Sequence, residues 1–349
     1  MKKLVSTLLC LLLITGLLAG CGGSQGSSQP TQGSTEATQA PVKAIDLKMN
    51  VTTSDASVWM VGAKEFKRII EEKTNGKYIV SIFPNEQLSG GDLQKGTEML
   101  FTGITDLDMR SVINMTGFDP RLTVTSMPWL FTKGYDSVDE ILFDGEGGKM
   151  LASMIEEKGV KVLGMGENGF RQLTNNARPI HAPADLARLK IRTPPIAMYV
   201  ELYKLFGADP TAMNFGEVFT SLQQGTIDGQ ENPYDTIRSA KIQEVQKYMT
   251  IWNYSYDPFM IMSSGKLWNS LTDEEKEIFL EAGKAAGAAQ VKASREKDAE
   301  IIEEFSKIME INELTPEEVA AFQAAAAPIY EMYKDTIGEE IFAAFGYKF

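Results

Sequence analysis

Cysteine and histidine are almost absent from this chain of 349 residues. Its two cysteines are Cys10 and Cys21, and His181 is its single histidine. The chain beyond Cys21 therefore has no thiol and no disulfide, and His- or Cys-rich zinc sites and Cys-His catalysis are excluded. A Ser-His-Asp triad would have to use His181, which lies in the proline-flanked segment RPIHAPADL, where we expect a solvated loop. We expect no metal, no cofactor and no catalytic residue.

Positive charge is also scarce. The chain has 34 lysines and arginines against 47 aspartates and glutamates, a net charge of -13. Loss of Lys2 and Lys3 with a signal peptide would leave -15. Such an acidic protein is repelled by phosphate backbones and by anionic lipid, so we expect no nucleic-acid partner.

Long apolar runs are confined to the N-terminus. Lys2 and Lys3 precede an apolar stretch over residues 4–14, which ends in small residues at Leu-Ala-Gly-Cys21. The stretch is too short to cross about 30 Å of hydrocarbon, and it predicts a secretory signal peptide over residues 1–20. Leu-Ala-Gly-Cys resembles a bacterial lipobox, in which the cysteine is acylated. We expect a lipid on Cys21; an ordinary signal peptide with an incidental cysteine is the alternative.

Residues 21–44 follow as a lipidated cysteine and linker. Residues 22–41 contain one charge, Glu36, and no large apolar side chain, so they cannot bury a core. A coil of this composition has a reach of roughly 25 Å. The protein is thus expected outside the cytoplasm, held to the cell membrane only by its lipid, in a periplasm or on a cell surface.

The remaining 300 or so residues exceed what one core usually holds, so two lobes are expected. Helical and extended patterns alternate, which predicts an α/β fold with a mainly parallel, helix-covered sheet. Strands are predicted at residues 47–53, 78–83, 104–109, 160–163, 171–175, 190–193, 227–231, 249–254 and 259–262. Helices are predicted at residues 58–73, 93–101, 137–142, 148–158, 195–206, 217–224 and 234–246.

One predicted helix is unusually long. Residues 272–309 contain no proline, keep helical periodicity and begin with Thr272 and Glu275 in a capping-box relation. At 1.5 Å per residue this helix would measure roughly 55 Å, so we expect it to lie across both lobes. Thr315 and Glu318 start another helix in the same way.

Two motifs suggest chemistry that their surroundings do not support. Gly164, Gly166 and Gly169 form G-x-G-x-x-G after a strand, but residues 170–180 are predicted to be extended, and a dinucleotide site needs a helix there. Ser263 and Lys266 match S-x-x-K without the companion motifs of acyl-enzymes.

Pairs of carboxylates leave one enzymatic alternative open. Asp106 and Asp108 share a strand face, and Asp228 and Glu231 flank a glycine, so a hydrolase that uses two carboxylates is conceivable. Their spacing is not diagnostic, and solvated surface acids are the simpler interpretation.

Two arginines point to an anionic ligand instead. Arg171 and Arg192 each lie in or beside a predicted strand, flanked by apolar or small residues. A guanidinium keeps its charge and matches a carboxylate with two parallel hydrogen bonds. The alternative is that each arginine pairs with an acid of the protein itself.

The segment from Gly164 to Tyr234 resembles a known family. It reads GMGENGFRQLTNNARPI, then DLARLKIRTPP, then LFGADPTAMNFGEVFTSLQQGTIDGQENPY. These motifs, above all I-D-G-Q-E-N-P after Glu217, resemble the DctP-type solute-binding proteins of TRAP (tripartite ATP-independent periplasmic) transporters. The resemblance implies a two-lobe, periplasmic-binding-protein-like fold of class II type, with an interlobe cleft and a long helix spanning both lobes. We expect lobe I at residues 45–168 and 257–297, and lobe II at residues 169–256 and 298–349.

The resemblance also implies a site. Arg192, in the K-I-R-x-P strand, would anchor the ligand carboxylate, with Arg171 and the amide of Asn232 assisting. Phe215 would pack on the ligand, and Trp59 and Ser111 would belong to the variable wall from the first lobe. Arg110, just before Ser111, would face solvent or offer a partner to a second anionic group, so mono- and dicarboxylates both stay open.

The implied function is transport rather than catalysis. A monomeric receptor would close around a small carboxylate, such as a uronate or another sugar acid or a C4-dicarboxylate, and deliver it to the TRAP membrane permease. A ligand-binding module of a sensor or of another transporter is the alternative, and a surface hydrolase is the one least supported.

Overall fold

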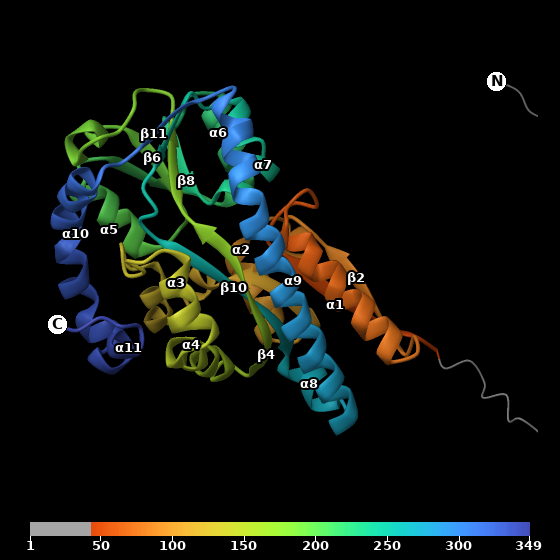
Figure 1. Cartoon of the computed structure of the whole chain (residues 1–349). Coiled ribbons are helices and arrows are strands. Elements are labelled where there is room, and N and C mark those ends of the chain that lie inside the picture. Colours follow the sequence, from red (N-terminus) through yellow and green to blue (C-terminus); the bar gives the residue numbers. More distant parts are fainter. Residues whose placement is uncertain (1–42) are drawn as a thin grey trace, which may run out of the picture. The chain divides into compact units, whose positions relative to one another are not determined.

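The computed structural model describes residues 43–349, which form two β-sheets covered by helices (Figure 1). The predicted signal peptide, Cys21 and nearly all of the predicted linker lie outside the described residues. Within residues 43–349, no helix combines the length and the apolar character needed to cross a bilayer.

The first sheet has five strands in the order β2-β1-β3-β10-β4. They are β1 (Ile45–Val51), β2 (Tyr78–Phe83), β3 (Leu107–Ser111), β4 (Val160–Phe170) and β10 (Tyr256–Ser264). β1 pairs in parallel with β2 and β3, whereas β10 runs antiparallel to β3 and β4. The sheet is therefore mixed and not mainly parallel, because β10 brings the chain back from the second sheet in the opposite direction.

The second sheet has six strands in the order β11-β9-β5-β8-β6-β7. They are β5 (Gln172–Asn175), β6 (Lys190–Thr193), β7 (Asp209–Ala212), β8 (Gly229–Asn232), β9 (Tyr248–Ile251) and β11 (Glu310–Glu313). β6 is parallel to β7 and β8, while β5 is antiparallel to β8 and β9. We call the two halves built on these sheets the first and second lobes.

Helices cover both sheets, and most begin where their sequence predicts. They are α1 (Trp59–Lys73), α2 (Leu93–Phe101), α3 (Tyr135–Val138), α4 (Glu146–Glu156), α5 (Ala197–Leu205), α6 (Val218–Gln223), α7 (Tyr234–Ser239), α8 (Gly265–Ser270), α9 (Asp273–Ser306), α10 (Pro316–Ile337) and α11 (Glu339–Ala344). Asp92, for example, caps α2 by accepting hydrogen bonds from the amides of Gln94 and Lys95, both at 3.0 Å. The predicted helix over residues 234–246 was wrong in length: it ends at Ser239, because Lys241 takes a left-handed conformation at φ 59°.

The long helix α9 contacts elements of both lobes. It packs along α1 and β4 of the first lobe and reaches α7 and β11 of the second (Figure 1). Its capping box is formed, with the Thr272 amide 2.9 Å from Glu275 Oε2 and the Glu275 amide 3.3 Å from Thr272 Oγ1. At 34 residues it is about 51 Å long, and the expectation of one helix spanning both lobes is confirmed.

The three glycines of the G-x-G-x-x-G pattern lie inside β4, where Gly164 lets α9 approach closely. A Cβ added to Gly164 would lie 2.2 Å from the Gly283 carbonyl oxygen, and one on Gly283 would lie 2.4 Å from the Leu163 oxygen. A Cβ on Gly287 would lie 2.2 Å from the Met165 oxygen. Gly164 therefore serves packing between a strand and a helix. The pattern is not a dinucleotide site, since β4 continues to Phe170 and no helix follows the glycines.

We expect Gly283→Ala to destabilise the fold although alanine is the better helix former. The added methyl group meets backbone atoms of β4 that cannot rotate away, and such overpacking costs about 1–3 kcal/mol. The midpoint of urea unfolding should fall, while the exposed neighbour Lys284→Ala should leave it nearly unchanged. An unchanged midpoint in Gly283→Ala would mean that α9 can shift away from β4 freely.

Candidate carboxylate site between the lobes

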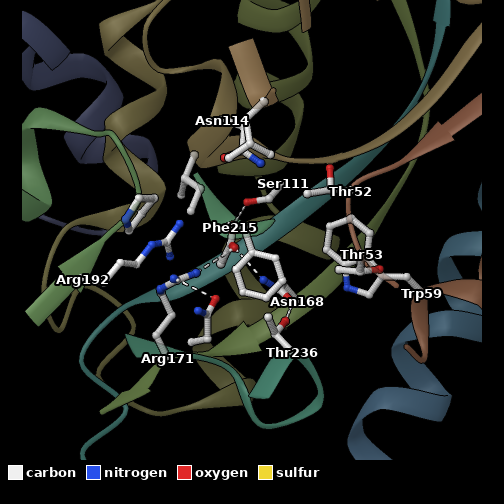
Figure 2. A pocket seen from close by; sticks show the side chains of 15 residues that line it. Thr52, Thr53, Trp59, Ser111, Asn114, Asn168, Arg171, Arg192, Phe215 and Thr236 are labelled. Atoms are coloured by element: carbon white, nitrogen blue, oxygen red, sulfur yellow. Dashed lines mark hydrogen bonds and ion pairs between the residues drawn. The ribbon is translucent and has the colours of Figure 1, made fainter. Parts of the chain in front are cut away.

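A pocket with about 410 Å³ of empty space lies between the two sheets (Figure 2). All six residues singled out from the sequence line it: Trp59, Ser111, Arg171, Arg192, Phe215 and Asn232. The other lining residues are Thr52, Thr53, Leu93, Ile113, Asn114, Asn168, Pro194, Thr236 and Asp257. Their roles in ligand binding stay predictions; their convergence on one pocket is observed.

Strand ends bring these side chains together. Thr52 and Thr53 follow β1, Ser111 ends β3, and Asn232 ends β8. The carboxyl ends of parallel strands face the crevice in open α/β sheets, and polar residues there reach a common site. Arg171 lies between β4 of the first sheet and β5 of the second, so it is placed where the chain passes from one lobe to the other.

Arg171 is neutralised by acids of the protein. Its Nη2 donates to Glu231 Oε1 at 2.8 Å, its Nε also pairs with the Glu231 carboxylate, and its Nη1 lies 3.2 Å from Asp257 Oδ2. Nη2 donates to Asn232 Oδ1 as well, at 3.1 Å. Burial alone would lower the pKa of Arg171, but Glu231 and Asp257 outweigh it and raise the pKa well above its ordinary value.

Arg192 is different, because it has no acidic partner among residues 43–349. It is 2% exposed, and its Nε and Nη2 donate to one carbonyl oxygen, that of Met213, at 3.1 and 2.8 Å. Burial lowers the pKa of Arg192 to about 9, although the nearby charge of Glu231 opposes the fall; Arg171 adds to it, and Glu217 opposes it weakly. A buried cation without an ion-pair partner is costly, so an anion bound in this pocket would be stabilised by Arg192. Figure 2 shows the two guanidinium groups side by side at one end of the pocket.

A hydrogen-bonded chain that the sequence did not reveal forms the floor of the pocket. Asp257 accepts hydrogen bonds from Ser111 Oγ and from Asn168 Nδ2, the second at 2.9 Å. Thr236 Oγ1 in turn donates to Asn168 Oδ1 at 2.7 Å. Burial raises the pKa of the Asp257 carboxyl, although Arg171 opposes the rise. These residues lie on segments far apart in the chain, and no local motif marks them.

Two aromatic side chains close the pocket. Trp59 is 1% exposed and stacks on Phe259, with ring centroids 4.0 Å apart. The Phe215 ring lies 5.8 Å from Arg192 Cζ, within cation–π range. Both offer apolar faces to a ligand held at the arginines.

The carboxylates considered for a hydrolase each accept hydrogen bonds from the protein itself. Glu231 is held by Arg171 and by the Tyr254 hydroxyl, which donates at 2.7 Å, and Asp228 accepts from the Lys190 amide at 2.8 Å. Asp106 accepts from the Lys48 amide at 2.9 Å. His181 is exposed at the surface beside Glu318, as its polar loop predicts.

Arg110 corrects one expectation directly. It neither faces solvent nor lines the pocket: it is 0% exposed and bound to Asp108 at 2.9 Å and to Glu86 at 2.8 Å. The alternation that places Asp106 and Asp108 on one strand face places Arg110 there too. The pairing of Arg110 with Asp108 could therefore be predicted from the sequence.

Comparison with known proteins decides the family. The model of bacterial extracellular solute-binding proteins, family 7, also called DctP, matches residues 49–336. The chain belongs to this family. The 2,3-diketo-L-gulonate-binding periplasmic protein YiaO of Escherichia coli is 33% identical over 260 residues, which cover 74% of this chain and 78% of YiaO.

Solved structures of the family share the two-lobe fold described above. A TRAP periplasmic solute-binding protein from Ralstonia eutropha H16, with bound (S)-2-acetolactate, superimposes with a TM-score of 0.83 at 30% identity and covers 86% of this chain and 98% of that one. One from Sulfurospirillum deleyianum, with bound succinate, has a TM-score of 0.81 at 31% identity, with the same coverages of 86% and 98%. This DctP-family protein is thus a TRAP solute-binding protein. Members of the family bind solutes outside the cytoplasm, and this binding serves transport.

Proposed function

We propose that Arg192, assisted by Arg171 and Asn232, binds the carboxylate of a small organic acid in the pocket between the lobes. The observation that carries this proposal is the buried guanidinium of Arg192 without an acidic partner among the described residues. Relatives with bound acetolactate and succinate support the same class of ligand. The pocket thereby serves binding and transport rather than catalysis.

The binding free energy available from these side chains is close to what micromolar affinity requires. Hydrogen bonds to charged groups are worth about 1.5–3 kcal/mol each, and micromolar affinity requires roughly 8 kcal/mol. Two arginines and an amide supply most of this free energy. Because the lining comes from both lobes, a bound ligand holds them together, and hinge closure follows binding.

A thermal-shift screen of purified residues 43–349 tests the ligand class. Carboxylates, keto acids, sugar acids and uncharged sugars would be added one at a time at equal concentration. A carboxylate at a hundred times its dissociation constant adds about 2.7 kcal/mol of stability, and the uncharged sugars should add none. Stabilisation by uncharged sugars alone would contradict the proposal.

The ligand would then be delivered to a TRAP membrane permease, and a lipid on Cys21 would keep the receptor near it. The lipobox-like Leu-Ala-Gly-Cys sequence supports the anchor. Expression in a bacterium fed radiolabelled palmitate should label the full chain in the membrane fraction, and Cys21→Ala should abolish the label and release the protein. Equal labelling of both proteins would contradict the anchor.

A contact outside the pocket is proposed to hold the lobes closed. Asp235, at the start of α7, accepts from Ser57 Oγ at 2.6 Å and from the Val58 amide at 3.0 Å, just before α1 of the first lobe. Its other oxygen accepts from Arg238 at 2.7 Å. A carboxylate at the N-terminus of a helix is favourable, so this contact stabilises the closed arrangement.

We expect Asp235→Ala to weaken carboxylate binding about tenfold or more, since two charge-assisted hydrogen bonds, from Ser57 and Val58, are lost from the closed form alone. Titration calorimetry with the tightest carboxylate from the screen measures this. Asp136→Ala is the matched control, because Asp136 also lies in the first turn of a helix but is exposed. An affinity equal to that of the control would show that the contact is made with or without ligand.

A further inference from the structure

The wall opposite the two arginines is polar but carries no positive charge. Among the described residues that line the pocket, Arg171 and Arg192 are the only cations, and both guanidinium groups lie at one end (Figure 2). Thr53 and Trp59 lie at the other end in the same view. A ligand that reaches across the pocket meets a carboxylate site first and a neutral polar wall beyond it.

Arg110 cannot supply the missing charge. It lies in β3, next to Ser111, but donates to Glu86 at 3.1 Å, to Asp108 at 2.9 Å and to the Leu93 carbonyl oxygen at 3.0 Å. Two carboxylates thus neutralise one guanidinium behind the wall. A Cβ on Gly96 would lie 2.3 Å from Glu86 Oε2, so the glycine of α2 makes room for this ion pair.

Two hydroxyls of the pocket, Thr52 in this wall and Ser111 in the floor, are already committed as donors. Thr52 Oγ1 donates to Glu86 Oε1 at 3.0 Å, and Ser111 Oγ donates to Asp257. A hydroxyl has one proton, so toward the ligand both oxygens offer only lone pairs. Lone pairs attract the O–H group of an alcohol and repel a carboxylate, which has no proton to donate.

Two further polar groups of the wall have no partner within the described part of the chain. Thr53 Oγ1 and Trp59 Nε1 are buried and unbonded, and the two residues are 4% and 1% exposed. An unbonded buried polar group costs about 1–3 kcal/mol, and the indole nitrogen can only donate. Alcohol groups, which donate and accept, satisfy every one of these four positions.

We propose that the pocket takes a monocarboxylate bearing several hydroxyl groups and disfavours the dicarboxylate of the same chain length. This inference rests on the proposed carboxylate site at Arg192 and adds what occupies the other end. The ligand class is therefore that of the aldonic and related sugar acids, rather than the C4-dicarboxylates.

Matched ligand pairs test the inference by titration calorimetry. D-Erythronate against meso-tartrate and galactonate against galactarate each exchange a terminal CH2OH group for a carboxylate. We expect the monocarboxylate of at least one pair to bind about tenfold or more tighter than its dicarboxylate, and Arg192→Ala to weaken that binding about 30-fold or more. Tighter binding of the dicarboxylates, still dependent on Arg192, would overturn the inference and leave the proposed function standing. Binding indifferent to Arg192, or no binding of any of the four acids or of the screened carboxylates, would overturn both.

A pair of isosteric variants tests the wall itself. Thr53→Val removes an unbonded hydroxyl, so the ligand-free protein should unfold at the same or a higher temperature, while galactonate or erythronate binds about tenfold more weakly. Thr105→Val is the control, because Thr105 Oγ1 is also buried and unbonded but lies outside the pocket lining. Equal affinity of the two variants for the hydroxy acid would overturn the role of the wall.

Discussion

Arg192→Ala is expected to lose 2–5 kcal/mol of carboxylate binding, roughly a 30-fold or greater rise in the dissociation constant. The reason is that the ligand's carboxylate supplies the counter-ion that this buried guanidinium lacks among the described residues. Removal of Arg192 leaves that carboxylate buried beside Arg171 alone, whose charge Glu231 and Asp257 already neutralise. Titration calorimetry of the parent protein and of Arg192→Ala, each with the same carboxylate, measures the loss.

The same variant should have the opposite effect on the free protein. An unpaired buried cation is unfavourable, so ligand-free Arg192→Ala should unfold at the same temperature as the parent or higher. Arg192→Lys should fail to restore affinity, because an ammonium group cannot donate the parallel pair of hydrogen bonds. Arg178→Ala, an exposed arginine of the same lobe, is the control and should bind normally. Near-parent affinity in either Arg192 variant would contradict the site.

Glu231→Ala is expected to have the largest effect on stability, about 3–5 kcal/mol. Glu231 is fully buried and forms the two-pronged ion pair with Arg171, and the Tyr254 hydroxyl also donates to it. Its loss leaves Arg171 with one carboxylate, Asp257, and leaves the Tyr254 hydroxyl without its acceptor. Urea unfolding of the ligand-free protein measures the free energy.

The control for this variant is an exposed acid of the same lobe. Glu244→Ala removes a surface carboxylate 4.0 Å from Lys241, and exposed pairs contribute about 0–1 kcal/mol. If Glu231→Ala were no more harmful than Glu244→Ala, water would have to enter and solvate Arg171, and the pocket floor would not be a fixed platform.

Local sequence signals predicted the bounds of a helix or strand well where a proline or a capping side chain begins or ends it. The predicted ranges of β2 and α2 match the structure, because Pro84 cannot continue a strand and Asp92 caps a helix. The direction of β10 and the edge strands β7 and β11 could not be predicted in this way. Pairing partners for those strands come from distant parts of the chain, and periodicity carries no information on them.

The site shows the same division. Arg192 and Arg171 could be found because charged residues beside apolar strands are conspicuous, although the sequence alone could not tell which of them pairs with protein acids. Asp257, Asn168 and Thr236 escaped notice because their only distinguishing property is that folding brings them together. One partner of Arg110, Asp108, could be predicted because it lies two residues away on the same strand face. The other, Glu86, could not, because it lies in a distant part of the sequence.

The helix α9 has a mechanical consequence. Gly287 fixes one part of it against β4 of the first lobe, and Ile301 and Phe305 fix another in the apolar cluster of the second. Gln290 and Arg295 extend the first of these attachments, because both bind Glu167 of β4. Since the helix is continuous from there to Ile301, rotation of the lobes apart would bend residues 296–300. Opening therefore stores elastic strain in that stretch and stretches its solvent-side hydrogen bonds. Amide hydrogen exchange there should slow when ligand binds, which makes a helix outside the pocket a reporter of its occupancy.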